Sequence, residues 1–139
     1  MILNPSNPRL TDEEFYERYS DTVDAMPGDY FLFASDDTEI HPELITRWND
    51  DRMNNPAAGI WMVAQRTATG HRFVDMISFL NGELDNGQAI ISTQFFRSLN
   101  LRYYAFGWER FLFRKMYEMA PDKFRFIYEP LALHDHQRI

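Results

Sequence analysis

Three short apolar runs, each closed by turn-forming residues, constrain the fold of this chain most strongly. They occupy residues 30–34 (YFLFA), 59–65 (GIWMVAQ) and 88–92 (QAIIS). Apolar runs of this length, bounded by turn signals, are typical of buried strands. Helical patterns lie between and around them. The sequence therefore predicts the α/β class, with α+β as the alternative arrangement, and a mixed sheet flanked by helices.

Four segments carry the spacing and the end signals of helices. The first begins at Thr11, which can form a capping box with Glu14, and the second begins at Pro42. Pro and Gly residues or paired asparagines end both. The last two cover residues 93–100, with Thr93 as the cap, and 108–119. The positions expected to face the core are Phe15, Tyr19, Val23, Leu44, Ile45, Trp48, Phe111, Leu112, Met116 and Met119.

The remaining segments are mostly polar or mixed. Residues 35–39, 67–72 and 81–87 are predicted as loops or turns. Residues 73–80 fit a third strand or a short helix. Two closing strands, 124–128 and 131–133, are expected on either side of Pro130.

Composition excludes several classes of protein. The chain has 139 residues, which suggests one domain, and a net charge of −7, which argues against a general nucleic-acid binder. It has no cysteine, so disulfides and thiolate chemistry are excluded. No apolar run approaches the roughly 20 residues of a membrane span, and MILNPSNPRL lacks the features of a signal peptide. We expect a soluble, cytoplasmic protein.

A pair of adjacent carboxylates, Asp36 and Asp37, directly follows the first apolar run. Each raises the cost of ionising the other, and water or a bound cation relieves that cost. Ligands of open α/β sheets bind outside the carboxyl ends of strands. Carboxylates there suit Mg²⁺ or Mn²⁺, which favour oxygen ligands. For the dipeptide alone, a solvated turn is the stronger interpretation.

Two other groups of residues offer polar chemistry. His134 follows the last apolar segment and is either a metal ligand or part of a polar tail. Trp108, at a loop-to-helix junction, can form an apolar wall for a sugar or a base. Glu109, in the first helical turn, is either a general base or a favourable charge at the helix dipole. The chain contains no nucleophile elbow, Walker loop, GxGxxG or HExxH motif.

The order of these elements resembles the catalytic half of GT-A fold glycosyltransferases, most closely the family 2 type. The resemblance rests on GDYFLFASDDTEIHPELI, GQAIISTQFF and FGWERFLF, followed by a strand that ends in His, and it covers roughly residues 15–136. It implies one truncated GT-A-like domain over residues 1–139. It also implies a DXD-like motif that binds Mn²⁺ or Mg²⁺, and a nucleotide-sugar donor whose diphosphate the metal holds.

The resemblance implies roles by position. Asp37 matches the metal-binding aspartate, and Asp36 and Ser35 belong to the substrate-binding part of the motif, where Ser35 replaces a frequent Asp. His134 matches a late histidine that can complete the metal shell, and it is preferred over His136 for this role.

The remaining roles fall at the start of the last helix. Glu109 matches the catalytic base, although Arg110 stands where a second acid is often found. Trp108 looks like the aromatic wall of the acceptor site. The acceptor itself is a hydroxyl that the sequence does not identify, and attack assisted by Glu109 would invert the sugar's configuration.

Members of this family usually begin with a βαβ segment that holds the nucleotide, and only about ten residues precede the first predicted helix here. Three explanations are open: a fragment or split-gene product, a chain that pairs with another chain supplying the nucleotide half, or a non-catalytic remnant. The expected partners are therefore a complementing chain or a second copy in a homo-oligomer. The alternative to a transferase is a GT-A-like interaction or assembly protein that binds through Tyr103, Tyr104 and Phe106. A lower-ranked reading is a metal-dependent phosphoesterase that uses the same acids.

Overall fold

The structure is a computed structural model of the chain. It describes residues 28–32, 38–67, 70–72, 76–81, 86–100 and 108–134, together with Glu14, Arg18, Asp21, Thr22 and Ala25. These last five residues are helical, in agreement with the first predicted helix. Thr11 of its capping box and its apolar positions 15, 19 and 23 lie outside the described residues.

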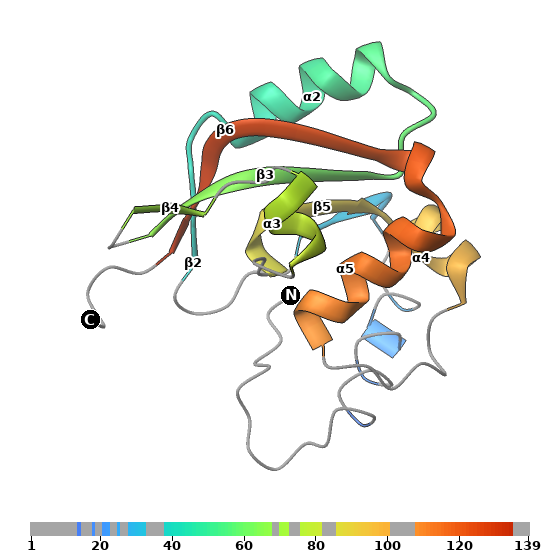
Figure 1. Cartoon of the computed structure of the whole chain (residues 1–139). Coiled ribbons are helices and arrows are strands. Elements are labelled where there is room, and N and C mark those ends of the chain that lie inside the picture. Colours follow the sequence, from blue (N-terminus) through green and yellow to red (C-terminus); the bar gives the residue numbers. More distant parts are fainter. Residues whose placement is uncertain are drawn as a thin grey trace.

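Six strands form one sheet: β1 (Tyr30–Phe31), β2 (Thr38–Ile40), β3 (Ile60–Thr67), β4 (Gly70–Arg72), β5 (Ala89–Ser92) and β6 (Phe124–His134). The order is β1-β5-β3-β6-β2, with β4 paired to β3 (Figure 1). Strands β3 and β6 run parallel, whereas the other pairs are antiparallel. The predicted α/β class with a mixed sheet is therefore confirmed.

Besides the helical residues near the N-terminus, the described part contains four helices and two short 3₁₀ turns: α2 (Leu44–Asn54), α3 (Met76–Leu80), η1 (Asn86–Gln88), α4 (Thr93–Leu99), α5 (Trp108–Met119) and η3 (Pro121–Lys123). Figure 1 shows α2 on one side of the sheet and α3, α4 and α5 on the other. No helix within these residues is long and apolar enough to cross a membrane.

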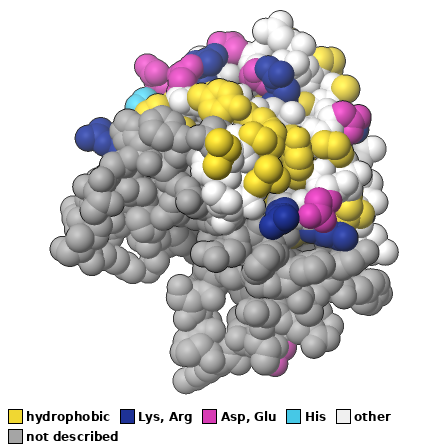
Figure 2. Space-filling view, in the orientation of Figure 1, with side chains coloured by type: hydrophobic (Ala, Val, Ile, Leu, Met, Phe, Trp, Pro, Cys, Tyr) yellow, Lys and Arg dark blue, Asp and Glu magenta, His cyan; other side chains and the backbone are white. Residues whose placement is uncertain are grey.

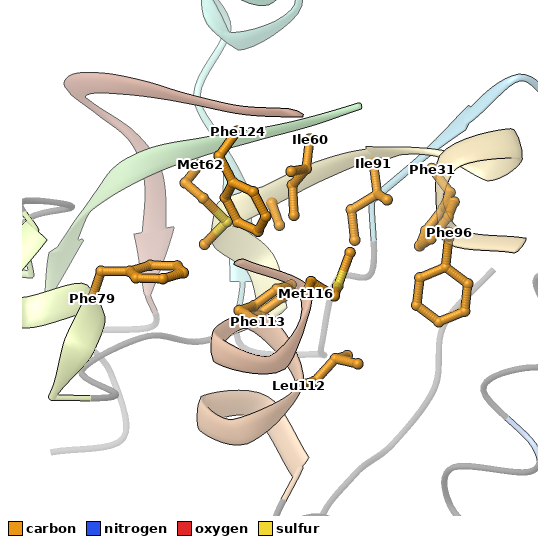
Figure 3. Packing of buried hydrophobic residues seen from close by; sticks show 11 residues of the cluster. Phe31, Ile60, Met62, Phe79, Ile91, Phe96, Leu112, Phe113, Met116 and Phe124 are labelled. Carbon is orange, nitrogen blue, oxygen red and sulfur yellow. The ribbon is translucent and has the colours of Figure 1, made fainter. Parts of the chain in front are cut away.

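Strand β3 divides the core into two parts because its side chains alternate between the faces of the sheet. Ile60 and Met62 face α5 and contact the first cluster, which also contains Phe31, Phe79, Ala89, Ile91, Phe96, Leu112, Phe113, Met116 and Phe124. Figure 3 shows these side chains gathered between the sheet and α5. Trp61 and Val63 face α2 and belong to the second cluster, with Leu44, Ile90, Ile127, Leu131 and Ala132.

Aromatic rings anchor α2 to the second face. Tyr30, Trp48 and Trp61 meet edge to face, with centroid distances of 4.9 Å for Tyr30–Trp48 and 5.8 Å for Trp48–Trp61. The guanidinium carbon of Arg52 lies 5.4 Å from the centre of the Tyr30 ring and 5.2 Å from that of Trp48. These contacts hold the helix over the end of β1.

Gly59 allows α4 to pack closely on the start of β3. The Phe95 side chain lies against the backbone of Gly59, where a Cβ atom would stand only 2.7 Å from Phe95 Cδ2. The backbone of Gly59 is held on both sides, since its N–H donates to the Lys123 carbonyl and its carbonyl accepts from the Ser92 N–H. A side chain at this position would therefore push α4 away from the sheet.

Two predicted loops contain strands instead. Thr38 and Glu39 belong to β2, which pairs with the end of β6, and residues 67 and 70–72 pair in the hairpin of β3 and β4. Both strands are short and mostly polar, so they carry no apolar periodicity, and the backbone partner of β2 comes from the far end of the chain. Residues 76–80 adopt the helical alternative, as α3.

The two predicted closing strands form one continuous strand, β6. Its register on β3 shifts between Val63, which faces Ile127, and Ala64, which faces Pro130. Tyr128 and Glu129 are the extra residues of this bulge. A bulge is one of the few places where a strand tolerates proline, which lacks the N–H needed for a ladder hydrogen bond.

Several details of the helices also differ from the prediction. Ser92, not Thr93, is the N-cap of α4, because its hydroxyl accepts from the Phe95 N–H. Ile45 and Met119 are exposed, whereas Phe113 is buried. The buried face of α2 is narrow, so Ile45 at its edge faces solvent. The buried face of α5 is centred on Leu112, Phe113 and Met116, so Met119 at its edge faces solvent as well. The bounds 108–119 for α5 are confirmed.

Candidate functional site

The predicted metal motif lies outside the described residues, which end at Leu32 and resume at Thr38. Ser35, Asp36 and Asp37 are therefore bracketed by described residues without being described themselves. Trp108 and Glu109 form the start of α5 and His134 the end of β6, but the side chains of these three residues are likewise outside the described part. Their predicted roles remain predictions.

The sheet brings two parts of this predicted site together. Strands β2 and β6 are antiparallel, and Thr38 faces His134 across the pair. Opposite residues of such a pair lie about 5 Å apart between Cα atoms. The residue that follows Asp37 in the chain is thus a direct neighbour of the predicted histidine ligand, although Thr38 and His134 are 96 positions apart in the chain.

The described acidic and histidine side chains do not themselves make a metal site. Across the ranges that the structure describes, no group of three or more His, Asp or Glu side chains is placed to hold an ion. His41 has a structural role instead, because its Nδ1 accepts from the Glu43 N–H at 3.1 Å and its carbonyl accepts from the Leu44 N–H. It shapes the turn that begins α2.

A pocket of about 400 Å³ opens between α2 and the sheet. Its lining includes Leu32, which precedes residues 33–37 in the chain, and Ile40, which follows them. The other lining residues are Asp29, Tyr30, Phe31, Leu44, Ile45, Trp48 and Ile90. Strands β1 and β2, from opposite ends of the strand order, share this pocket, so the sheet is strongly curled around it.

A charged network lies on the same face, at the far end of α2. The Asp51 carboxylate accepts from Arg125 Nε at 3.0 Å, Arg125 Nη2 at 2.9 Å and Trp61 Nε1 at 3.0 Å. The hydrogen bonds and charge of Arg125 lower the pKa of Asp51, with a smaller contribution from Trp61, while burial opposes them. Asp51 therefore stays ionised and ties α2 to β3 and β6.

A second ion pair ties α2 to the bulge of β6. Arg47 Nε donates to Glu129 Oε1 at 2.8 Å. The hydrogen bond lowers the pKa of Glu129 and raises that of Arg47. Both side chains are exposed to solvent, which weakens such a pair. Sequence reasoning did not identify Asp51, Arg125, Arg47 or Glu129, because pairs distant in the chain leave no local signal.

Comparison with known proteins assigns the chain to no group: no protein-family model matches it, and no curated protein is significantly similar to it. The site must therefore be judged from its residues and its geometry.

Hydrophobic side chains gather over α3 and β6 on the face shown in Figure 2. Ile77 is 74% exposed and Tyr128 is 57% exposed, with Met76 and Leu80 beside Ile77 on α3. Tyr128 stacks on Phe126, which in turn meets Phe79 of α3 edge to face. We call Met76, Ile77, Leu80 and Tyr128 the α3–β6 patch. Contiguous apolar surface of this kind is typical of interaction sites.

Proposed function

We propose that this chain is a metal-dependent glycosyltransferase, or the catalytic part of one, which transfers a sugar from a nucleotide-sugar donor to an acceptor hydroxyl. One observation carries the proposal beyond the sequence motifs. The register of β2 on β6 pairs Thr38 with His134, so the two segments assigned to the metal are neighbours in the sheet. The mixed sheet flanked by helices also agrees with the proposed truncated GT-A fold.

The donor set is compatible with a divalent cation. Asp37 and His134 would hold Mn²⁺ or Mg²⁺, with Asp36 and Ser35 beside the donor, because carboxylates and water suit both ions. The imidazole of His134 favours Mn²⁺ over Mg²⁺ because nitrogen ligands suit transition metals better. When bound, the ion neutralises charge on the departing nucleotide diphosphate.

The acceptor side of the proposed reaction relies on the start of α5. Glu109 would accept the proton of the acceptor hydroxyl as that oxygen attacks the sugar, and Trp108 would form an apolar wall that orients the acceptor. Attack opposite the leaving diphosphate gives a product with inverted configuration at the sugar carbon.

The proposal is tested by calorimetric titration of nucleotide sugars, with and without Mn²⁺. Asp37→Asn should abolish metal-dependent binding, whereas Asp122→Asn, which alters an exposed carboxylate in η3, should leave it unchanged. The panel should be repeated with candidate partner chains present. Absence of metal-dependent binding to every donor under both conditions would refute the transferase.

A second candidate function is an interaction or assembly protein, which the α3–β6 patch favours. Here we propose that the patch buries its exposed side chains against another copy of the chain. Ile77→Lys should then shift the sedimentation coefficient toward that of a monomer. Met53→Lys is the matched control, since Met53 is 69% exposed but lies on α2, outside the patch. A wild-type protein that sediments as a monomer at high concentration would contradict this function.

A further inference from the structure

The residues that line the pocket between α2 and the sheet are buried at its floor and exposed at its rim. Its floor includes Leu44 and Ile90, which are 1% and 4% exposed. At its rim, Ile40 is 51% exposed and Ile45 is 58% exposed. These two side chains come from different elements, β2 and α2. Large aliphatic residues left in solvent at the mouth of one cavity indicate a surface that is covered when something binds.

The lining determines what kind of group fits. Five of its nine residues are leucine or isoleucine: Leu32, Ile40, Leu44, Ile45 and Ile90. Such side chains offer no hydrogen bonds, so they favour an apolar occupant. The volume of about 400 Å³ falls within the range of ligand pockets, roughly 300–1,000 Å³. The occupant is therefore an apolar group of modest size.

The aromatic part of the lining favours an aliphatic occupant over a planar one. The rings of Tyr30 and Trp48 already meet edge to face, and the guanidinium of Arg52 covers both. A planar ligand would have to compete for ring faces that are partly occupied, whereas a flexible chain needs only contact with the aliphatic walls.

The charge of the protein near the pocket restricts the charge that the polar end of the ligand can carry. Asp29, which is exposed, is the only charged residue among the described residues that line the pocket; Arg52 covers the rings of Tyr30 and Trp48 without belonging to the lining. The whole chain carries a net charge of −7. Both disfavour an anionic headgroup at the mouth of the pocket, because like charges repel.

We propose that this pocket binds a single aliphatic chain that belongs to a neutral or cationic ligand. The inference goes beyond the transferase and does not depend on it, because the lining residues are described and binding needs neither a metal nor a nucleotide sugar. Leu32 and Ile40 bracket residues 33–37 in the chain, so an occupied pocket would also lie beside both ends of the segment that carries Asp36 and Asp37.

Titration with n-hexanol, n-octanol and n-decanol, in buffer with EDTA, tests the proposal. Each methylene group that enters an apolar site contributes about 0.8 kcal/mol, which corresponds to roughly fifteenfold tighter binding for every two carbons. We expect this increment until the pocket is full and a smaller one thereafter. Trp48 lines the pocket, so its fluorescence can report binding alongside calorimetry.

Matched variants separate the pocket from non-specific adsorption. Ile45→Asp places a charge at the rim and should weaken octanol binding at least tenfold, whereas Met53→Asp alters a somewhat more exposed residue of the same helix outside the pocket and should not. Ile40→Asp provides the same test from β2. Circular dichroism verifies that each variant is folded, and a fold lost in both rim variants leaves the chain-length series of the wild type as the decisive measurement.

Three results would overturn the proposal. These are an affinity that does not depend on chain length, equal weakening by Ile45→Asp and Met53→Asp, and tighter binding of the planar probe 2-naphthol than of octanol. Since the assay contains no metal or donor, its failure would leave the transferase untouched, and the calorimetric test of the donor would leave the pocket untouched.

Discussion

Replacement of Gly59 by alanine should destabilise the protein, although alanine is usually the more stable residue. A Cβ atom at position 59 would lie 2.7 Å from Cδ2 and 2.8 Å from Cβ of Phe95. Ordinary contacts between carbon atoms are about 3.5–4.0 Å. Relief therefore requires Phe95, and with it the first turn of α4, to move by several tenths of an ångström or more. Part of the obstruction is the Phe95 Cβ atom, which rotation of the ring cannot displace.

Two opposing terms set the magnitude. Overpacking of a well-packed site costs about 1–3 kcal/mol. Loss of glycine's freedom in the unfolded chain contributes about 0.4–1 kcal/mol in the other direction. The cost of the clash exceeds this gain over most of the range, so we expect a net loss of roughly 1–2 kcal/mol. At about 4 °C per kcal/mol for a chain of this size, the melting temperature should fall by roughly 4–8 °C.

Urea unfolding followed by circular dichroism measures the change, with Gly28→Ala as the control. A Cβ atom at position 28 would meet only the Tyr30 carbonyl oxygen, at an ordinary 3.5 Å, so Gly28→Ala should be neutral or slightly stabilising. Gly59→Ala should cost less when combined with Phe95→Ala, since the ring is then absent. The reasoning is refuted if Gly59→Ala is as stable as the wild type, or if its cost is the same with and without the Phe95 ring.

Further predictions concern the polar contacts that fix α2 and α4. Asp51→Ala should cost about 1–3 kcal/mol in urea unfolding, because it leaves the buried Trp61 N–H without its acceptor, whereas Glu129→Ala, which breaks an exposed pair, should have no measurable effect. The pKa of Asp51 is lowered in the folded state, so its carboxylate stabilises the fold above its unfolded pKa of about 3.9. The difference in unfolding free energy between wild type and Asp51→Ala should therefore narrow as the pH falls below about 4. A difference that is unchanged at pH 2–3 would contradict this. Thr93→Val should cost about 1 kcal/mol, since the Thr93 hydroxyl donates to the carbonyls of Gly28 and Asp29, and an unchanged midpoint would show that water replaces it.

Much of the fold could be predicted because its main helices and strands are indicated by local sequence patterns. The run GIWMVAQ indicates the central strand β3, and the spacing of Leu112 and Met116 indicates α5. The fold class follows from such elements, since buried strands between helices have few ways to cover their faces. The prediction fails where an element is short and polar, as β2 and β4 are, because such strands carry no apolar periodicity, and β2 in addition depends on β6, a partner far away in the chain.

The candidate site divides along the same line. Asp36, Asp37, Glu109 and His134 could be selected as candidates because their residue types and their order resemble those of GT-A fold glycosyltransferases. The pairing of Thr38 with His134 could not, since it arises from the register of β2 on β6. The pocket also escaped prediction. Its nine lining residues come from four separated elements and from the residues on either side of β1, and each of them alone resembles an ordinary core or surface position.

The sequence by itself determined which segments become the long elements, because the spacing of apolar residues and the turn-forming residues act over a few positions. It also determined which chemical groups are available. The tertiary structure alone decided what those groups lie beside: the bulge at Tyr128 and Glu129, the tie of Asp51 to Arg125 and Trp61, the exposure of Ile45, and the pocket beneath it. The physical reason is that contact energies between distant residues depend on how the sheet curls and which register it adopts, and neither is encoded in any short stretch of the chain.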